Sequence, residues 1–156
     1  MSGLSGLYLP GERLVEVAVR GNPVGQGNIR SLGKGRPSVH ANAATLKPWR
    51  QQIQAAVEDA LDWDTTPNVG PVLVDATFTV KKPVAAPKRR RTFPVTRPDI
   101  DHYIRAVLDA VGAAGLWRDD SQVVEVHARK VYPGEHPWSL QTPGLVLQVN
   151  ALKAEP

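Results

Sequence analysis

The 156-residue chain contains no cysteine, which excludes disulfide bonds and thiolate zinc sites and favours a reducing cytoplasm. It also lacks an apolar run near the roughly 20 residues needed to cross a bilayer, so we expect no membrane partner. The first residues show no basic stretch followed by an apolar one, and we therefore predict no signal peptide. With 42% hydrophobic residues, the chain is suited to one domain with its own core.

Several catalytic patterns are missing as well. There is no GxxxxGK[ST] phosphate loop and no GxSxG nucleophile elbow, which argues against an NTPase and against a serine hydrolase. The histidines have no spacing typical of a zinc site. The four histidines are His40, His102, His127 and His136.

Hydrophobic periodicity predicts a single α+β domain, in which a mixed β-sheet packs with two main helices in the order β-α-β-α-β-β. Alternating or short apolar runs indicate the strands, and stripes with a 3.6-residue period indicate the helices. The expected strands are 14–20, 72–80, 122–132 and 145–149, and the expected helices are 45–61 and 102–111. We expect a loop or an irregular hairpin at 21–40, a flexible N-terminal segment at 1–12 and the domain at 13–152.

The positive charge is concentrated in one segment. The net charge is +4, and the segment 81–97 holds seven cations and no acid. These cations are Lys81, Lys82, Lys88, Arg89, Arg90, Arg91 and Arg97. Such a block is either a solvated loop or a surface that contacts nucleic-acid phosphates, and charge alone leaves both interpretations open.

Acidic residues follow this basic segment in two pairs. Asp99 and Asp101 stand where the second helix begins, and Asp119 and Asp120 precede the next strand. In one interpretation Asp101 only caps the helix. In the other, the following strand runs beside Asp99, so that three or four carboxylates converge on a divalent cation that neutralises their repulsion.

Oxygen ligands alone suit Mg²⁺, with Mn²⁺ as a substitute. A cation held beside a phosphate-binding loop suits hydrolysis of a phosphodiester, with one metal or two. The stretch Pro98-Asp99 is also shared with PD-(D/E)xK nucleases, but the acid-x-Lys of that family is absent from Glu125-Val126-His127.

The stretch RPDIDHYIRAVLDAV, followed by GLWRDDSQVVEVHARK, resembles the signature of the RusA family of Holliday junction resolvases. In that family an R-P-D-x-D-N segment opens a helix that reads roughly K-x-x-x-D-A-L, and a D-D-S-Q segment leads into a strand. The resemblance extends over Arg97 to Lys130, and GNPVGQGNIR is similar, more weakly, to the family's G-x-P-x-x-K-x-R-x-R stretch.

The resemblance implies a homodimeric, Mg²⁺-dependent endodeoxyribonuclease of a bacterial or phage-infected cytoplasm. Such an enzyme nicks four-way DNA junctions symmetrically in recombination and repair and leaves 5′-phosphate ends. The family's essential aspartates fall on Asp99, Asp101 and Asp120, and Asp119 is an adjoining metal ligand. The family's functional lysine falls on Arg105.

Two positions depart from the family pattern. His102 stands where the family has asparagine, and arginine at position 105 keeps the positive charge but cannot act as a base at neutral pH. Arg105 also stands four residues before Asp109, so a helix-face ion pair is its alternative role. These departures leave open a non-catalytic or degenerate protein that binds branched DNA.

Overall fold

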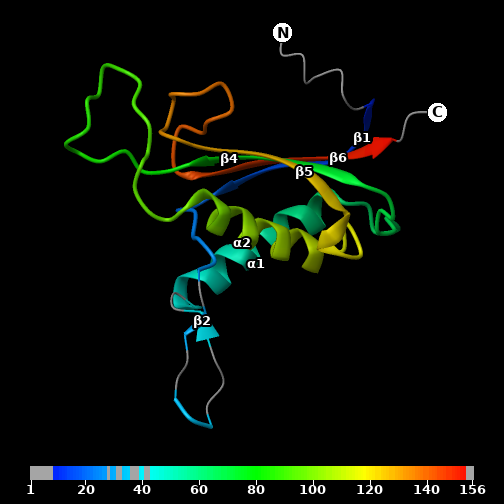
Figure 1. Cartoon of the computed structure of the whole chain (residues 1–156). Coiled ribbons are helices and arrows are strands. Elements are labelled where there is room, and N and C mark those ends of the chain that lie inside the picture. Colours follow the sequence, from blue (N-terminus) through cyan, green and yellow to red (C-terminus); the bar gives the residue numbers. More distant parts are fainter. Residues whose placement is uncertain (1–8, 28, 31–32, 36–38, 41–42, 154–156) are drawn as a thin grey trace.

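A four-stranded mixed sheet with two helices on one face forms the body of the molecule (Figure 1). The computed structural model describes residues 9–27, 29–30, 33–35, 39–40 and 43–153. The elements of the body are β1 (Leu9–Arg20), α1 (Ala43–Ala60), β4 (Val72–Thr79), α2 (Ile100–Ala113), β5 (Val123–Val131) and β6 (Gly144–Lys153). A small hairpin of β2 (Ile29–Arg30) and β3 (Val39–His40) projects away from this body, and a 3₁₀ helix, η2 (Asp120–Gln122), precedes β5.

The strand order in the sheet is β1-β6-β4-β5. Strand β6 pairs antiparallel with β1 and with β4, whereas β4 and β5 are parallel. A parallel pair needs a crossover connection, and here α2 supplies it. Helix α2 therefore starts where β4 and β5 end, and it ends near the point where β5 starts.

The α+β class and the element order β-α-β-α-β-β agree with the sequence prediction. Both helices begin two residues earlier than expected, because a helical stripe shows which residues face the core but not which residue starts the first turn. Strand β1 starts at Leu9, while residues 1–8 of the expected flexible segment lie outside the described residues. In the described part of the chain, neither helix is long and apolar enough to span a membrane.

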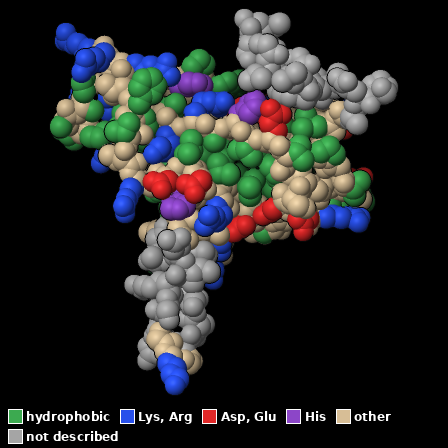
Figure 2. All heavy atoms as spheres, viewed as in Figure 1, with side chains coloured by type: hydrophobic (Ala, Val, Ile, Leu, Met, Phe, Trp, Pro, Cys, Tyr) green, Lys and Arg blue, Asp and Glu red, His purple; other side chains and the backbone are tan. Residues whose placement is uncertain are grey.

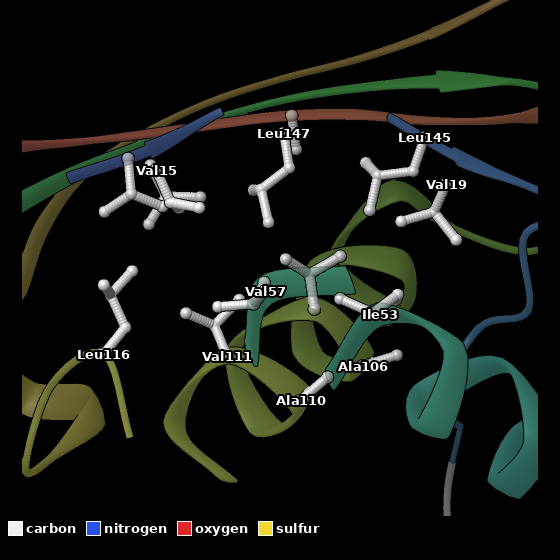
Figure 3. Packing of buried hydrophobic residues seen from close by; sticks show 14 of the residues in the cluster. Val15, Val19, Ile53, Val57, Ala106, Ala110, Val111, Leu116, Leu145 and Leu147 are labelled. Atoms are coloured by element: carbon white, nitrogen blue, oxygen red, sulfur yellow. The ribbon is translucent and has the colours of Figure 1, made fainter. Parts of the chain in front are cut away.

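The hydrophobic core lies between the sheet and the two helices (Figure 3). Val15, Val19, Leu145 and Leu147 point from the sheet toward the helices, and all four are buried. The facing side chains of the helices are also buried, and they come from Ile53, Val57, Ala106, Ala110 and Val111. Each aliphatic side chain buried here contributes roughly 1.5–3 kcal/mol of transfer free energy, which makes the helix positions rigid.

An aromatic contact fixes the first half of α2. The rings of Tyr103 on α2 and Phe78 on β4 stack with centroids 4.9 Å apart, and both residues are buried. Replacing a buried Phe by Ala typically costs about 3–5 kcal/mol. The start of α2 is therefore firmly attached to the central strand of the sheet.

Candidate metal centre

Three side chains at the start of α2 form a group with the composition of a cation site. Asp99, Asp101 and His102 each offer one ligand atom, and these atoms all lie within 4.8 Å of one another. The two aspartates are exposed and His102 is half-buried. Within the group, His102 Nε2 lies 3.9 Å from Asp101 Oδ2.

The start of the helix keeps both carboxylates available. Asp99 occupies the N-cap position with an extended backbone, but its side chain makes no capping hydrogen bond. Asp101 lies inside the first turn, so the alternative in which Asp101 caps the helix is wrong. Free amides of a first turn favour nearby negative charge, and they therefore help to hold two carboxylates close together.

The segment that leads into this group is held from two sides. Lys130 at the end of β5 donates from Nζ to the backbone oxygens of Thr96 (2.9 Å) and Pro98 (3.0 Å). From the other side, the backbone N–H of Gln26 donates to the His102 carbonyl at 2.9 Å. A Cβ added at Gly25 would lie 2.8 Å from the Pro98 side chain, so only glycine lets the loop approach this closely.

The second acidic pair lies at the opposite end of α2. Asp120 Oδ1 lies 3.0 Å from the point where a Cβ on Gly112 would stand. Gly112 follows Asp101 by eleven residues on the helix, which corresponds to about 16 Å along its axis. Acidic side chains accordingly gather at both ends of α2 in Figure 2. Within one chain the structure brings Asp99 and Asp101 together but leaves Asp119 and Asp120 apart from them.

Hydrogen bonds anchor this second pair. Trp117, which is buried, donates from Nε1 to Asp120 Oδ1 at 2.8 Å. Asp119 is the N-cap of η2 and accepts from the Ser121 N–H at 2.8 Å. Hydrogen bonding from Ser121, first from its side chain and then from its N–H, lowers the pKa of Asp119 below its usual value. The Gln122 side chain accepts from the Asp119 N–H, completing a capping box.

Arg105 lies on the exposed face of α2 between the two acidic ends. The ion pair with Asp109 that was its alternative role is not formed: Asp109 instead accepts from Gln26 Nε2 at 2.7 Å and lies 3.8 Å from Arg50 Nη1. Among the residues that the structure describes, no ion pair of Arg105 is found. Its guanidinium is therefore available to a phosphate.

The basic segment forms the loop that joins β4 to α2, and Lys and Arg side chains gather at this end of the molecule (Figure 2). Six of the seven cations are exposed: Lys81, Lys88, Arg89, Arg90, Arg91 and Arg97. The exception is Lys82, whose ammonium lies 2.6 Å from the Glu135 carboxylate. The loop thus carries an exposed cationic surface that leads directly into Asp99.

The donor set at the start of α2 fits a divalent cation. Two carboxylates suit Mg²⁺, and an added imidazole also suits Mn²⁺. The sequence analysis missed His102 as a ligand candidate and missed Lys130 as a support. The signal for His102 was its position directly after Asp101, whereas the contact of Lys130 depends on tertiary structure.

Comparison with known proteins assigns the chain to a family. The chain is 30% identical over 131 residues to the uncharacterized protein YqaN of Bacillus subtilis (strain 168). This alignment covers 78% of the chain and 89% of YqaN. The family model described as Endodeoxyribonuclease RusA matches residues 20–139, a range that includes the basic loop, both acidic pairs and Arg105. The chain therefore belongs to the RusA endodeoxyribonuclease family.

Proposed function

We propose that the protein is a Mg²⁺-dependent endonuclease that resolves four-way DNA junctions by paired symmetric nicks. It would act in recombination and repair in the cytoplasm of a bacterial or phage-infected cell and would leave 5′-phosphate ends. Family membership supports endodeoxyribonuclease activity. The observation that carries the metal dependence is the group of Asp99, Asp101 and His102 at the end of an exposed cationic loop.

Each part of this surface has a separate task in the proposal. The exposed cations of the 81–97 loop bind the phosphate backbone irrespective of sequence. Asp99 and Asp101 hold the cation, which when bound supplies charge neutralisation at the phosphate and activation of water. Arg105, one turn after Asp101 and without an ion pair in the described structure, neutralises charge on the phosphate in the transition state.

Asp120 fits this scheme only if a second protein chain completes the site. It lies about 16 Å from Asp101 along α2 of the same chain. A twofold axis that sets two copies of α2 antiparallel would place Asp120 of one protomer beside Asp101 of its partner. We therefore propose a homodimer with two composite metal sites, each of which cuts one of two opposed strands.

The flank formed by α2 and β5 exposes apolar side chains, as a dimer interface requires. Strand β5 is at the edge of the sheet, and Ile100, Val124 and Val126 are 37%, 62% and 40% exposed. Figure 2 shows further hydrophobic side chains along this flank, between the two acidic ends. An uncovered apolar strip on an unpaired edge strand favours association with another chain.

The separation of the acidic pairs also gives weight to a second candidate, a protein that binds branched DNA without cutting it. The test is Mg²⁺-dependent nicking of a labelled mobile four-way junction compared with linear duplex. We expect Asp101→Asn and Asp120→Asn to bind the junction in EDTA like the wild type and to lose nicking by at least about 10³-fold. Asp62→Asn, which removes an exposed carboxylate after α1, is the matched control and should nick normally.

Wild-type binding with no nicking in Mg²⁺ or Mn²⁺ would favour the non-catalytic candidate. Nicking that survives in Asp101→Asn would show that the metal site has been assigned to the wrong residues. Equal nicking of junction and duplex would remove the selectivity for branched DNA while leaving the nuclease activity.

A further inference from the structure

A shallow cavity of about 580 Å³, widely open to solvent, lies between the basic loop and the loop that joins β5 to β6. One wall consists of four consecutive cations, Lys88–Arg91, and the other wall consists of residues 134–137. The sequence analysis did not assign any role to this second loop. The cavity has one acidic residue in its lining, Glu135.

The Glu135 carboxylate joins two points of the basic loop, at Lys82 and at Thr92, which are the stems of the turn between them. Its Oε2 lies 2.6 Å from Lys82 Nζ near the start of the loop, and its Oε1 accepts from the Thr92 N–H at 2.8 Å, ten residues further along. Lys82 Nζ also donates to the Arg90 carbonyl at 3.2 Å and lies 5.6 Å from the centre of the Tyr132 ring. These contacts close the loop at its base, so that the segment between the stems is presented as one fixed turn.

The Lys82–Glu135 pair is also shielded from water, with side chains 16% and 15% exposed. The hydrogen bond from Lys82 holds the pKa of Glu135 below its usual value, although desolvation acts in the opposite direction. Glu135 is therefore ionised at neutral pH, and Lys82 neutralises it. Arg91 of the opposite wall also helps to lower this pKa, but in the described structure none of the cations Lys88–Arg91 forms an ion pair, so they are available to another anion.

We propose that this cavity binds a DNA phosphodiester and that Glu135 is a positioning residue, which together with Lys82 holds Lys88–Arg91 in the binding arrangement. The proposal rests on the proposed DNA function and gives Lys82 a different role from the six exposed cations. It concerns affinity for DNA, and it leaves the chemistry at Asp99 and Asp101 unchanged.

The direction in which one substitution changes the affinity for DNA distinguishes this proposal from charge attraction alone. Glu135→Gln removes a negative charge beside a cationic surface, so unaided charge attraction predicts tighter binding to DNA. Loss of the fixed loop predicts weaker binding, because the loop must then be ordered at the moment of association. For a fluorescent four-way junction in EDTA we expect the Glu135→Gln variant to bind roughly fivefold to tenfold more weakly than the wild type.

Three further proteins make the measurement specific. Glu16→Gln removes an acid paired with Arg13 on β1, at the opposite edge of the sheet, and should bind DNA like the wild type or slightly more tightly. Glu135→Asp keeps the charge but is too short to join both stems, and it should also bind more weakly. The double variant Lys82→Gln/Glu135→Gln should bind no worse than Lys82→Gln alone, because the two side chains act as one unit.

Trypsin digestion reports the loop directly, since Arg89–Arg91 supply cleavage sites at its exposed end. We expect faster cleavage there in Glu135→Gln with little change in melting temperature. Junction binding by Glu135→Gln as tight as that of the wild type, or tighter, would overturn the inference. A double variant whose loss of affinity equals the product of the losses in the two single variants would also overturn it. A wild-type protein that neither binds nor nicks junctions would instead contradict the proposed function itself.

Discussion

A pair of aspartates lies at each end of α2, but the two pairs differ in how they are hydrogen-bonded. At the start of the helix, Asp99 makes no capping bond, and Asp101 lies close to His102. At its end, Asp119 caps η2, and Asp120 accepts the indole N–H of Trp117. The first pair is available to a ligand from outside the chain, whereas the second is held in place by the fold.

This difference suggests a division of roles between the pairs. A loosely bonded pair can adjust its oxygens to the coordination distances of a cation. A carboxylate fixed by one oxygen to a buried indole presents its other oxygen in a constant direction. Such rigidity is useful when the remaining ligands belong to a partner, because nothing within the same chain can then orient that carboxylate.

The largest expected effect comes from mixing two inactive variants. If each site combines Asp101 of one protomer with Asp120 of its partner, a mixed dimer of Asp101→Asn and Asp120→Asn chains contains one intact site. Random exchange makes half of the dimers mixed, so nicking should return from near zero to about a quarter of the wild-type level. Nicking of a four-way junction after co-refolding of the two variants measures this directly.

The control for this experiment mixes Asp99→Asn with Asp101→Asn, which should stay inactive because both residues lie at the same end of α2. Failure of the first mixture to recover, in dimers verified as mixed by a size tag on one chain, would show that the two ends do not cooperate across a twofold axis.

A second prediction separates the two adjacent acids at the end of the helix. Asp119 Oδ1 already accepts the Ser121 N–H, which suggests a structural role for it. We expect Asp119→Asn to lower nicking by no more than about tenfold, compared with at least about 10³-fold for Asp101→Asn. Steady-state nicking rates at saturating Mg²⁺ would decide this, and equal losses in the two variants would establish Asp119 as a full metal ligand.

The sequence predicted the elements well because their hydrophobic periods depend on local packing. The stripe through Val107 and Val111 and the alternation through Val74 and Phe78 both face the core as expected. The expected convergence of three or four carboxylates on one site in a single chain is wrong, because hydrophobic periodicity does not determine how the ends of α2 and β5 meet. Strand β5 does return along α2, but its far end, Lys130, reaches the segment before Asp99, while its beginning stays with Asp120.

The features that the sequence did not reveal all depend on hydrogen bonds between distant segments. Gln26 donates a hydrogen bond to the Asp109 carboxylate, which helical spacing had indicated as the ion-pair partner of Arg105. Glu135 is bonded to Lys82 across 53 positions of the chain, so the charge count of the basic segment overestimates its free cations by one. Periodicity carries no information about such pairs, because each depends on how loops meet in three dimensions.

A third prediction tests whether the bond from Trp117 makes the second pair rigid. Trp117→Phe keeps an aromatic ring but removes the donor to Asp120, and we expect kcat for nicking to fall roughly tenfold while KM for the junction is unchanged. The stability loss should be about 1–3 kcal/mol. Rates and melting curves measured on the same samples separate the two effects.

Trp49→Phe is a matched control for this substitution. Trp49 is as deeply buried as Trp117, and its Nε1 is buried without a hydrogen-bond partner in the described structure. Its replacement loses similar packing but no bond to an acid, so kcat should be retained. An equal fall of kcat in both variants would attribute the effect of Trp117 to packing alone.

The smallest expected effect concerns the pH dependence of the anchored pair. Hydrogen bonds from the side chain and the N–H of Ser121 lower the pKa of Asp119 below its ordinary value of 3.8, so the folded state favours the charged carboxylate. The resulting stability is present above pH 3.8 and is lost as the pH falls through the lowered pKa. Asparagine caps helices nearly as well as aspartate, so the melting temperature of Asp119→Asn should lie only about 1–2 °C below that of the wild type at pH 6. Melting curves from pH 6 to pH 3 should show this gap closing, and a gap that widens toward pH 3 would mean that the charge of Asp119 opposes folding.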